Sequence, residues 1–158
     1  MVVISVVIPV YNKEQYVGNA LNDIKNQSFQ NYECIIIDDG SSDRSGQICE
    51  QFAHSDSRFR VIHTNNCGVS HARNIGLKES KGKYVTFVDA DDRIHKDYLN
   101  NLFQCISLSE ADLVISGIEK YWKSVCDRGK RTSYRKENVN IPFQGTIELT
   151  NILPEFVK

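Results

Sequence analysis

The chain has 158 residues, the length of one ordinary domain, and is long enough to bury a sizeable core. Hydrophobic residues make up 41% and charged residues 25%, a composition that argues against a disordered tail or a membrane span. The formal net charge of −1 argues against a general nucleic-acid binder. We therefore expect a soluble globular protein with no nucleic-acid partner.

The cysteines and the first residues of the chain indicate a cytoplasmic protein. The number of cysteines, five, is odd, and no two of them form a CxxC pair. This pattern argues against a disulfide framework or a zinc site and fits a reducing compartment. The opening residues MVVISVVIPV lack a basic region and are followed by polar sequence. They predict a buried strand instead of a signal peptide.

In chain order, the first two predicted units each consist of a strand and an amphipathic helix. Strand 3–9 precedes a helix whose apolar residues recur with the helical period, at Tyr16, Val17, Ala20, Leu21 and Ile24. Strand 32–38 leads through the turn DGSSD to a second helix, whose expected inward residues are Ile48, Cys49 and Phe52. Ser42 or Asp43 is expected to cap this second helix.

Two further units and one more strand follow. Strand 59–64 leads to a helix that we expect to be capped by Ser70 and to end near Lys81 and Gly82. Strand 83–89 leads through an acidic cluster to a helix with apolar residues at Tyr98, Leu99, Leu102, Phe103 and Ile106. Residues 111–117, ADLVISG, predict a fifth strand.

This alternation predicts the fold class. Strands that are apolar on both faces and alternate with helices indicate an α/β domain, with a mostly parallel sheet flanked by helices. In such a sheet ligands bind beyond the carboxyl ends of the strands. The candidate site therefore consists of the loops that follow the strands, which read PVYN, DDGSSD, NNCGVSHARN and DADD.

The DADD loop places three carboxylates, Asp89, Asp91 and Asp92, within four positions. Like charges this close repel each other unless a proton or a cation intervenes, and carboxylate oxygens are the ligands that Mg²⁺ or Mn²⁺ prefers. Water and a polyphosphate would complete the shell of such an ion. A helix start accounts for one acid through capping and the helix dipole, but not for three. The sequence therefore predicts a divalent metal site.

Two other loops carry candidate ligand-binding residues. A tight turn and a helix cap explain most of DDGSSD, but not both Asp38 and Asp39, and a carboxylate at a strand tip can accept a hydrogen bond from a nucleotide base. Arg73 lies near the start of a predicted helix, where guanidinium and backbone N–H groups together suit a phosphate. An Arg73 that is solvated or paired with one of the acids is equally compatible with the sequence.

Four stretches, in this order and spacing, resemble the family 2 glycosyltransferases of GT-A fold: SVVIPVYNKEQYVGNALNDIKNQSF, YECIIIDDGSSD, GVSHARNIGL and GKYVTFVDADD. Four motifs in register are far more specific than any one of them. The resemblance implies a Rossmann-like domain over residues 1–117 that binds a nucleotide-sugar donor. Residues 118–158 would begin a basic region on the acceptor side.

The resemblance also implies the residues around the nucleotide. Pro9, Tyr11 and Asn12 would lie around it, with Tyr11 against the base. Asp39 would hydrogen-bond the base, usually uracil, with Asp38 beside it.

For the rest of the donor, the resemblance implies a second group of residues. Arg73 would lie near the phosphates. The triplet Asp89, Ala90 and Asp91 matches the DxD motif, which binds the metal together with the ribose and diphosphate of the donor, and Asp92 follows it as it does in many relatives. The implied cofactor is Mg²⁺ or Mn²⁺.

Members of this family transfer a sugar to an acceptor hydroxyl with inversion, and a carboxylate base takes the proton from that hydroxyl. Relatives usually carry the base well downstream of the DxD motif, so we expect it beyond Lys158 and assign no catalytic residue. The available glutamates match no such motif and are more simply interpreted as surface residues; they are Glu110, Glu119, Glu137 and Glu148. A non-catalytic fragment that binds a nucleotide sugar is the alternative.

Residues 120–136 contain seven basic residues and one acid, a net charge of +6 that leaves −7 for the rest of the chain. A solvated hairpin or loop is the simpler interpretation. The alternative is contact with an anionic membrane surface or with a lipid-linked saccharide acceptor. We expect the protein in the cytoplasm, at the inner face of the membrane if its product is a cell-surface polysaccharide.

A different enzyme with an acidic loop and Mg²⁺ is the third hypothesis. Phosphatases of the haloacid-dehalogenase type and nucleotidyltransferases both use such loops. The sequence DADDR lacks the Thr or Val that the phosphatase motif has after its second acid, and the chain has no Gly-rich basic loop near its amino end. Neither enzyme is favoured.

Overall fold

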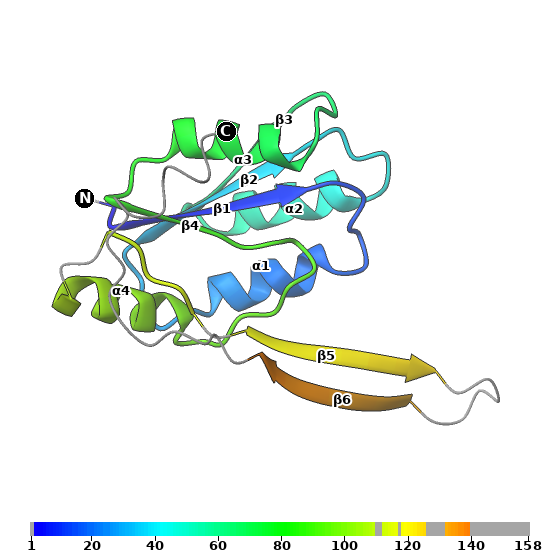
Figure 1. Ribbon diagram of the computed structural model, residues 1–158. Helices are drawn as coiled ribbons and strands as arrows, with labels where there is room; N and C mark the ends of the chain where they lie inside the picture. The colour runs from blue at the N-terminus through cyan, green and yellow to red at the C-terminus, as the bar shows by residue number, and fades with distance from the viewer. Residues whose placement is uncertain (1, 110–111, 117, 126–131, 140–158) are drawn as a thin grey trace, which may run out of the picture. The chain divides into compact units, whose positions relative to one another are not determined.

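The computed structural model describes residues 2–109, 112–116, 118–125 and 132–139 (Figure 1). The chain forms two compact units, Met1–Asn100 and Asn101–Lys158. The predicted domain boundary after residue 117 stays a prediction.

A parallel sheet is the centre of the first unit. Its strands are β1 (Ile4–Val10), β2 (Tyr32–Asp38), β3 (Phe59–His63) and β4 (Tyr84–Phe87). They lie in the order β3-β2-β1-β4, and every pair is parallel. All residues of the two central strands are buried, because neighbouring strands cover both edges and helices cover both faces. The predicted α/β sheet is therefore confirmed.

Three helices flank this sheet: α1 (Val17–Lys25), α2 (Ser45–Ser55) and α3 (Val69–Glu79). In Figure 1, α1 and α2 lie on one face and α3 lies on the other. The buried residues of α1 are those with the helical period, Val17, Ala20, Leu21 and Ile24. Tyr16 lies just before the helix and is exposed, so its predicted inward position is wrong.

The strand order reverses at β1, since β2 and β3 follow on one side of it and β4 lies on the other. At such a switch point the loops after the two neighbouring strands diverge and leave a crevice at their carboxyl ends. β1 pairs with β4 from Ile4 opposite Tyr84 to Val7 opposite Phe87. This register brings the loop after β1 close to the loop after β4.

Close packing of α3 on β1 forms the core on one face of the sheet. Val7, Ile35, Ile37 and Ala72 are all buried in this cluster. Gly76 faces Val7, and a Cβ added at Gly76 would overlap Cγ1 of Val7 and lie 3.1 Å from its Cγ2. The glycine therefore sets how closely the helix approaches the sheet.

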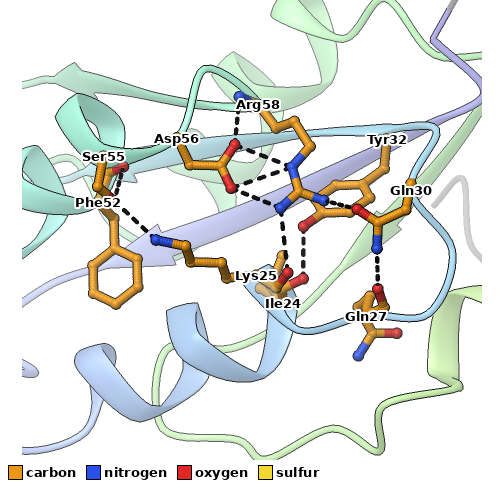
Figure 2. Close-up of polar contacts among 9 residues, drawn as sticks. All are labelled: Ile24, Lys25, Gln27, Gln30, Tyr32, Phe52, Ser55, Asp56 and Arg58. Atoms are coloured by element: carbon orange, nitrogen blue, oxygen red, sulfur yellow. Dashed lines mark hydrogen bonds and ion pairs between the residues drawn. The ribbon is translucent and has the colours of Figure 1, made fainter.

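Arg58 ties the amino ends of β2 and β3 to α1, as Figure 2 shows. Its guanidinium carbon lies 4.6 Å from the centre of the Tyr32 ring, and its Nη2 donates to Asp56 at 2.6 Å. The Tyr32 hydroxyl donates to the carbonyl oxygen of Ile24 at 2.7 Å. This polar cluster closes the end of the sheet opposite the candidate loops.

The chain after β4 is anchored by two polar side chains of the α1 region. The buried Gln27 donates to the carbonyl oxygen of His95 at 2.8 Å and accepts from the Leu99 N–H at 2.9 Å. Asp23 accepts two hydrogen bonds from the Arg93 guanidinium, at 2.5 and 2.9 Å. These contacts fix the path of the chain directly after the DADD loop.

Three sequence expectations about helices and strands are wrong. Helix α2 begins at Ser45 after Arg44, so neither Ser42 nor Asp43 is its N-cap, although the Asp43 carboxylate accepts from the Ser45 N–H at 2.9 Å. Helix α3 begins at Val69 after Gly68, whose φ of 92° favours glycine, so Ser70 lies inside the first turn and does not cap it. Residues 112–116 form no strand, and Leu113 and Ile115 are exposed. An apolar pattern makes a strand only where a neighbour takes its backbone hydrogen bonds, and no strand pairs with this segment in the described part of the chain.

The second unit contains most of α4 (Tyr98–Ser109) and an antiparallel hairpin, β5 (Ile118–Val125) and β6 (Thr132–Val139). The hairpin pairs Ile118 with Val139 at one end and Val125 with Thr132 at the other. This agrees with the hairpin interpretation of the basic segment, although residues 126–131 lie outside the described part. Cys126, Glu110 and Glu148 also lie outside the described part of the chain.

We predict that Gly76→Ala lowers the free energy of unfolding by about 1–3 kcal/mol, because the added methyl group overpacks the contact with Val7. Gly18→Ala is the matched control, since a Cβ there would lie 3.8 Å from Ile48 and alanine favours a helix. The control variant should be unchanged or more stable by up to about 1 kcal/mol. Urea unfolding measures both; equal stabilities would contradict the close packing.

Candidate functional site

A cavity of about 440 Å³ opens at the carboxyl ends of β1, β2 and β4, on the first unit. Seven residues predicted from the sequence line it: Pro9, Tyr11, Asp39, Arg73, Asp89, Ala90 and Asp91. Five others were not predicted: Lys13, Asn66, Gly68, Val69 and Ala72. The predicted residues Asn12, Asp38 and Asp92 do not line it. Because the lining residues come from β1, from α3 and from the loops after all four strands, only the fold brings them together.

Two cations neutralise the carboxylates of the DADD loop. Arg73 Nη2 lies 2.6 Å from Asp89 Oδ1, and Lys13 Nζ lies 2.6 Å from Asp91 Oδ2. All four side chains remain about one-third to one-half exposed, so the cavity reaches both pairs. The hydrogen bond from Lys13 to Asp91 raises the pKa of the lysine. The repulsion noted in the sequence is therefore relieved in this structure by two side chains.

Asp92 has a different environment from Asp89 and Asp91. Its backbone N–H donates to the Asp89 carbonyl oxygen at 3.0 Å, which closes the turn of the DADD loop. Desolvation of the carboxyl, followed by the charges of Asp89 and Asp91, raises the pKa of Asp92. The turn thus directs two carboxylates to the cavity and leaves the third away from it.

The donor chemistry of Asp89 and Asp91 fits a divalent cation, because both present hard carboxylate oxygens to the cavity. In the described part of the chain, no group of three or more His, Cys, Asp or Glu side chains is arranged to hold a metal. A divalent ion here would therefore take most of its ligands from water and from the phosphates of a bound nucleotide, as is common for Mg²⁺.

Asp39 is buried at the end of β2 and organises the loop before α3. Its Oδ1 accepts from the Cys67 N–H at 2.9 Å and from the Thr64 hydroxyl at 3.2 Å, and its Oδ2 accepts from the Gly68 N–H at 2.8 Å. A carboxylate offers about four acceptor positions. Asp39 lines the cavity, so one position is left for a ligand.

Asp38 lies outside the cavity and is bound to a histidine. Its Oδ2 is 2.8 Å from His63 Nδ1, and the other ring nitrogen of His63 is 2.9 Å from Glu50 of α2. The bond to Glu50, followed by the bond to Asp38, raises the pKa of His63. Gly46 of α2 allows the Asp38 carboxylate to lie this close to the helix, since a Cβ at position 46 would lie 2.7 Å from Asp38 Oδ2. Asp38 therefore joins β2, β3 and α2.

Asn12 connects the loop after β1 to the loop after β2. Its φ of 49° is in the left-handed region, which Asn tolerates better than most residues. Its side-chain oxygen accepts from the Ser42 N–H at 2.9 Å, and its own N–H donates to the Ser41 hydroxyl at 3.1 Å. The next residue is held similarly, because the Lys13 N–H donates to the Ser45 hydroxyl at 2.7 Å. These bonds fix the backbone from which Lys13 reaches Asp91.

The residues that the sequence analysis missed carried weak signals. Lys13 follows the PVYN loop directly, but its partner Asp91 lies 78 positions further along the chain. Asn66 belongs to the loop NNCGV that was already named as part of the candidate site. Loop membership could have suggested both residues, whereas their contacts needed the fold.

Comparison with known proteins identifies the family. The model of "Glycosyl transferase family 2" matches residues 5–154, which is most of the chain. This chain belongs to glycosyl transferase family 2. The resemblance stated from the motifs is thereby confirmed at the level of the family, and the four-stranded parallel sheet is that of the GT-A fold.

Individual relatives agree with this assignment. The chain is 41% identical over 121 residues to "Glycosyltransferase GlyA" and 41% identical over 122 residues to "Glycosyltransferase GlyG", both of Streptococcus pneumoniae serotype 4. Each match covers 77% of this chain, but only 17% of GlyA and 40% of GlyG. The chain thus spans less than half the length of either relative.

Among solved structures, S. aureus TarS in complex with UDP-GlcNAc is similar to this chain, with a TM-score of 0.65 and 34% sequence identity. The similarity covers 70% of this chain and 32% of that one.

None of the helices in the described part of our chain has the length and apolar character needed to cross a bilayer.

We predict that Glu50→Gln lowers the pKa of His63 towards its ordinary value of about 6.5, because a neutral amide no longer favours the charged ring. A histidine whose pKa is raised on folding contributes stability that is fully present below the unfolded-state pKa of about 6.5. This contribution is lost as pH rises from there through the folded-state pKa. The wild type should therefore lose stability over this pH range relative to Glu50→Gln. Titration of the His63 ring by NMR and urea unfolding across the same range test this. A His63 pKa unaffected by the substitution would contradict it.

Proposed function

We propose that the cavity binds a nucleotide diphosphate sugar, with a UDP-sugar as the favoured donor, and that the protein transfers the sugar to an acceptor hydroxyl with inversion. One observation carries the proposal: a single cavity at the switch point of the sheet joins two carboxylates, two cations and an exposed tyrosine ring. Membership of family 2 and the similarity to TarS, which was solved with UDP-GlcNAc, support it.

The lining residues divide the cavity into a base end and a phosphate end. Tyr11 is half exposed beside Pro9, so its ring offers a stacking surface for the base. The remaining acceptor position of Asp39 suits an N–H of that base, for which uracil is the expected choice. Asp38 and Asn12 do not line the cavity. Their role is to hold the loops that carry Asp39 and Tyr11.

At the phosphate end, Asp89 and Asp91 would hold Mg²⁺ or Mn²⁺, and Ala90 is the buried spacer that keeps both on the cavity wall. A bound metal would stabilise the negative charge that grows on the leaving diphosphate. Arg73, the fifth residue of α3, lines the cavity and would donate to the phosphate oxygens. Asp92 does not line the cavity, so we assign it to the turn and not to the ligand set.

The base that accepts the proton of the acceptor hydroxyl is expected outside the described residues. Glu119 and Glu137 belong to the hairpin, and we assign a catalytic role to neither. The alternative function, nucleotide-sugar binding without turnover, uses the same donor residues. A saccharide or a lipid-linked saccharide is the proposed acceptor.

Residues 120–136 are the proposed contact with an anionic membrane at its cytoplasmic face.

We predict that wild type binds UDP more tightly with Mn²⁺ than without it, and that Asp91→Ala loses most of this gain, about tenfold or more in affinity. The reason is that the variant lacks one of the two DADD-loop carboxylates on the cavity wall. Isothermal titration calorimetry with UDP, with and without Mn²⁺, measures the effect. Glu79→Ala, which removes an exposed carboxylate of α3 from outside the cavity, is the control and should bind as wild type does.

Two outcomes would count against the proposal. Wild type that fails to bind UDP with Mn²⁺ would overturn the assignment of the cavity. Full metal-dependent affinity in Asp91→Ala would overturn the assignment of the metal. Release of UDP from UDP-sugars in the presence of acceptor then separates a transferase from a binding module.

A further inference from the structure

The two ion pairs of the cavity place positive side chains where the proposed metal would bind. Lys13 Nζ is 2.6 Å from Asp91 Oδ2, and Arg73 Nη2 is 2.6 Å from Asp89 Oδ1. An ammonium at hydrogen-bonding distance occupies the space beside the oxygen that a divalent ion would use. A metal on the same carboxylates would also bring like charges close together. The lysine and the metal therefore compete for Asp91.

The competing cations are held so that their side chains can change partner. Hydrogen bonds to Ser45 and Ser41 fix the backbone of Lys13 and its neighbour, while the lysine side chain is 38% exposed on a flexible stem. Arg73 is fixed by its place on α3, and its guanidinium is also partly exposed. Both side chains line the same cavity as the carboxylates, so a released cation remains beside the phosphate end.

We propose that Lys13 and Arg73 are exchangeable counter-ions, which neutralise Asp91 and Asp89 in the donor-free protein and transfer to the diphosphate when nucleotide and metal bind together. This inference rests on the proposed function, and it adds Lys13 as a diphosphate-binding residue. A metal that binds without nucleotide must displace Lys13 or Arg73 from its carboxylate, and no phosphate is present to pair with the displaced side chain. A diphosphate that binds without metal must separate the same side chains from their carboxylates, and no metal is present to neutralise those carboxylates. Each ligand therefore binds weakly alone and strengthens the binding of the other.

Lys13 gives the cleaner test, because Arg73 is already assigned to the phosphates. We predict that Lys13→Gln binds Mn²⁺ alone about two- to fivefold more tightly than wild type, the range expected for loss of an exposed ion pair as a competitor. In the presence of UDP, the same variant should bind Mn²⁺ no more tightly, or more weakly, than wild type. The enhancement of Mn²⁺ affinity by UDP should therefore fall at least about twofold.

The measurement is Mn²⁺ titration followed by electron paramagnetic resonance, which detects the free ion and does not depend on catalytic activity. It is made on the whole chain, with and without UDP, at low salt because exposed ion pairs are screened. Lys78→Gln is the matched control, since Lys78 is exposed on α3 and lies outside the cavity. Lys13→Arg keeps the charge and should retain most of the wild-type enhancement. Thermal melting verifies that the variants are folded.

The outcomes separate this inference from the proposed function. If wild type shows no Mn²⁺-dependent binding of UDP, both fail together. If wild type binds as proposed but Lys13→Gln leaves the Mn²⁺ affinity and its enhancement by UDP unchanged, the exchange alone is overturned. If Lys78→Gln changes the Mn²⁺ affinity as much as Lys13→Gln does, the effect comes from the overall charge of the protein. This result would also overturn the exchange. A change confined to Lys13→Gln supports the exchange.

Discussion

The parallel pairing of β1 with β4 is the constraint on which the rest of the site depends. Two other strands and three helices separate these strands in the sequence, yet their register places Val7 opposite Phe87. The loops that leave their carboxyl ends therefore meet, and Lys13 reaches Asp91. Gly76 permits the close approach of α3 to β1. This approach brings Arg73, which α3 carries, to Asp89. A sheet with another strand order would separate these charges.

Two adjacent carboxylates at the end of β2 have mainly structural partners. Asp38 binds His63, and Asp39 binds the backbone N–H groups before α3. Buried carboxylates are costly unless they are hydrogen-bonded, so each carboxylate keeps its loop in one conformation. In the proposed function, the Asp39 carboxylate has two tasks, because it holds the cavity wall and would also contact the nucleotide base.

The presence of charges of both signs distinguishes this site from a simple acidic loop. The cavity carries Asp39, Asp89 and Asp91 together with Lys13 and Arg73, so an anionic diphosphate and a cation can both find partners there. In the proposed exchange, no new charged group has to form when the ligand binds, because the side chains that are already charged change partners. This arrangement suits a reaction in which negative charge develops on a leaving group.

The sequence by itself determined the type and order of the elements of the first unit, because the periods of apolar residues and the turn residues are local signals. It also determined the family, since four motifs such as PVYN and DADD occur in register. It could not determine which charges neutralise one another, because Lys13 and Asp91 lie 78 positions apart and meet only through the strand order. Nor could it show that the apolar residues 112–116 form no strand, because a strand depends on a partner elsewhere in the chain.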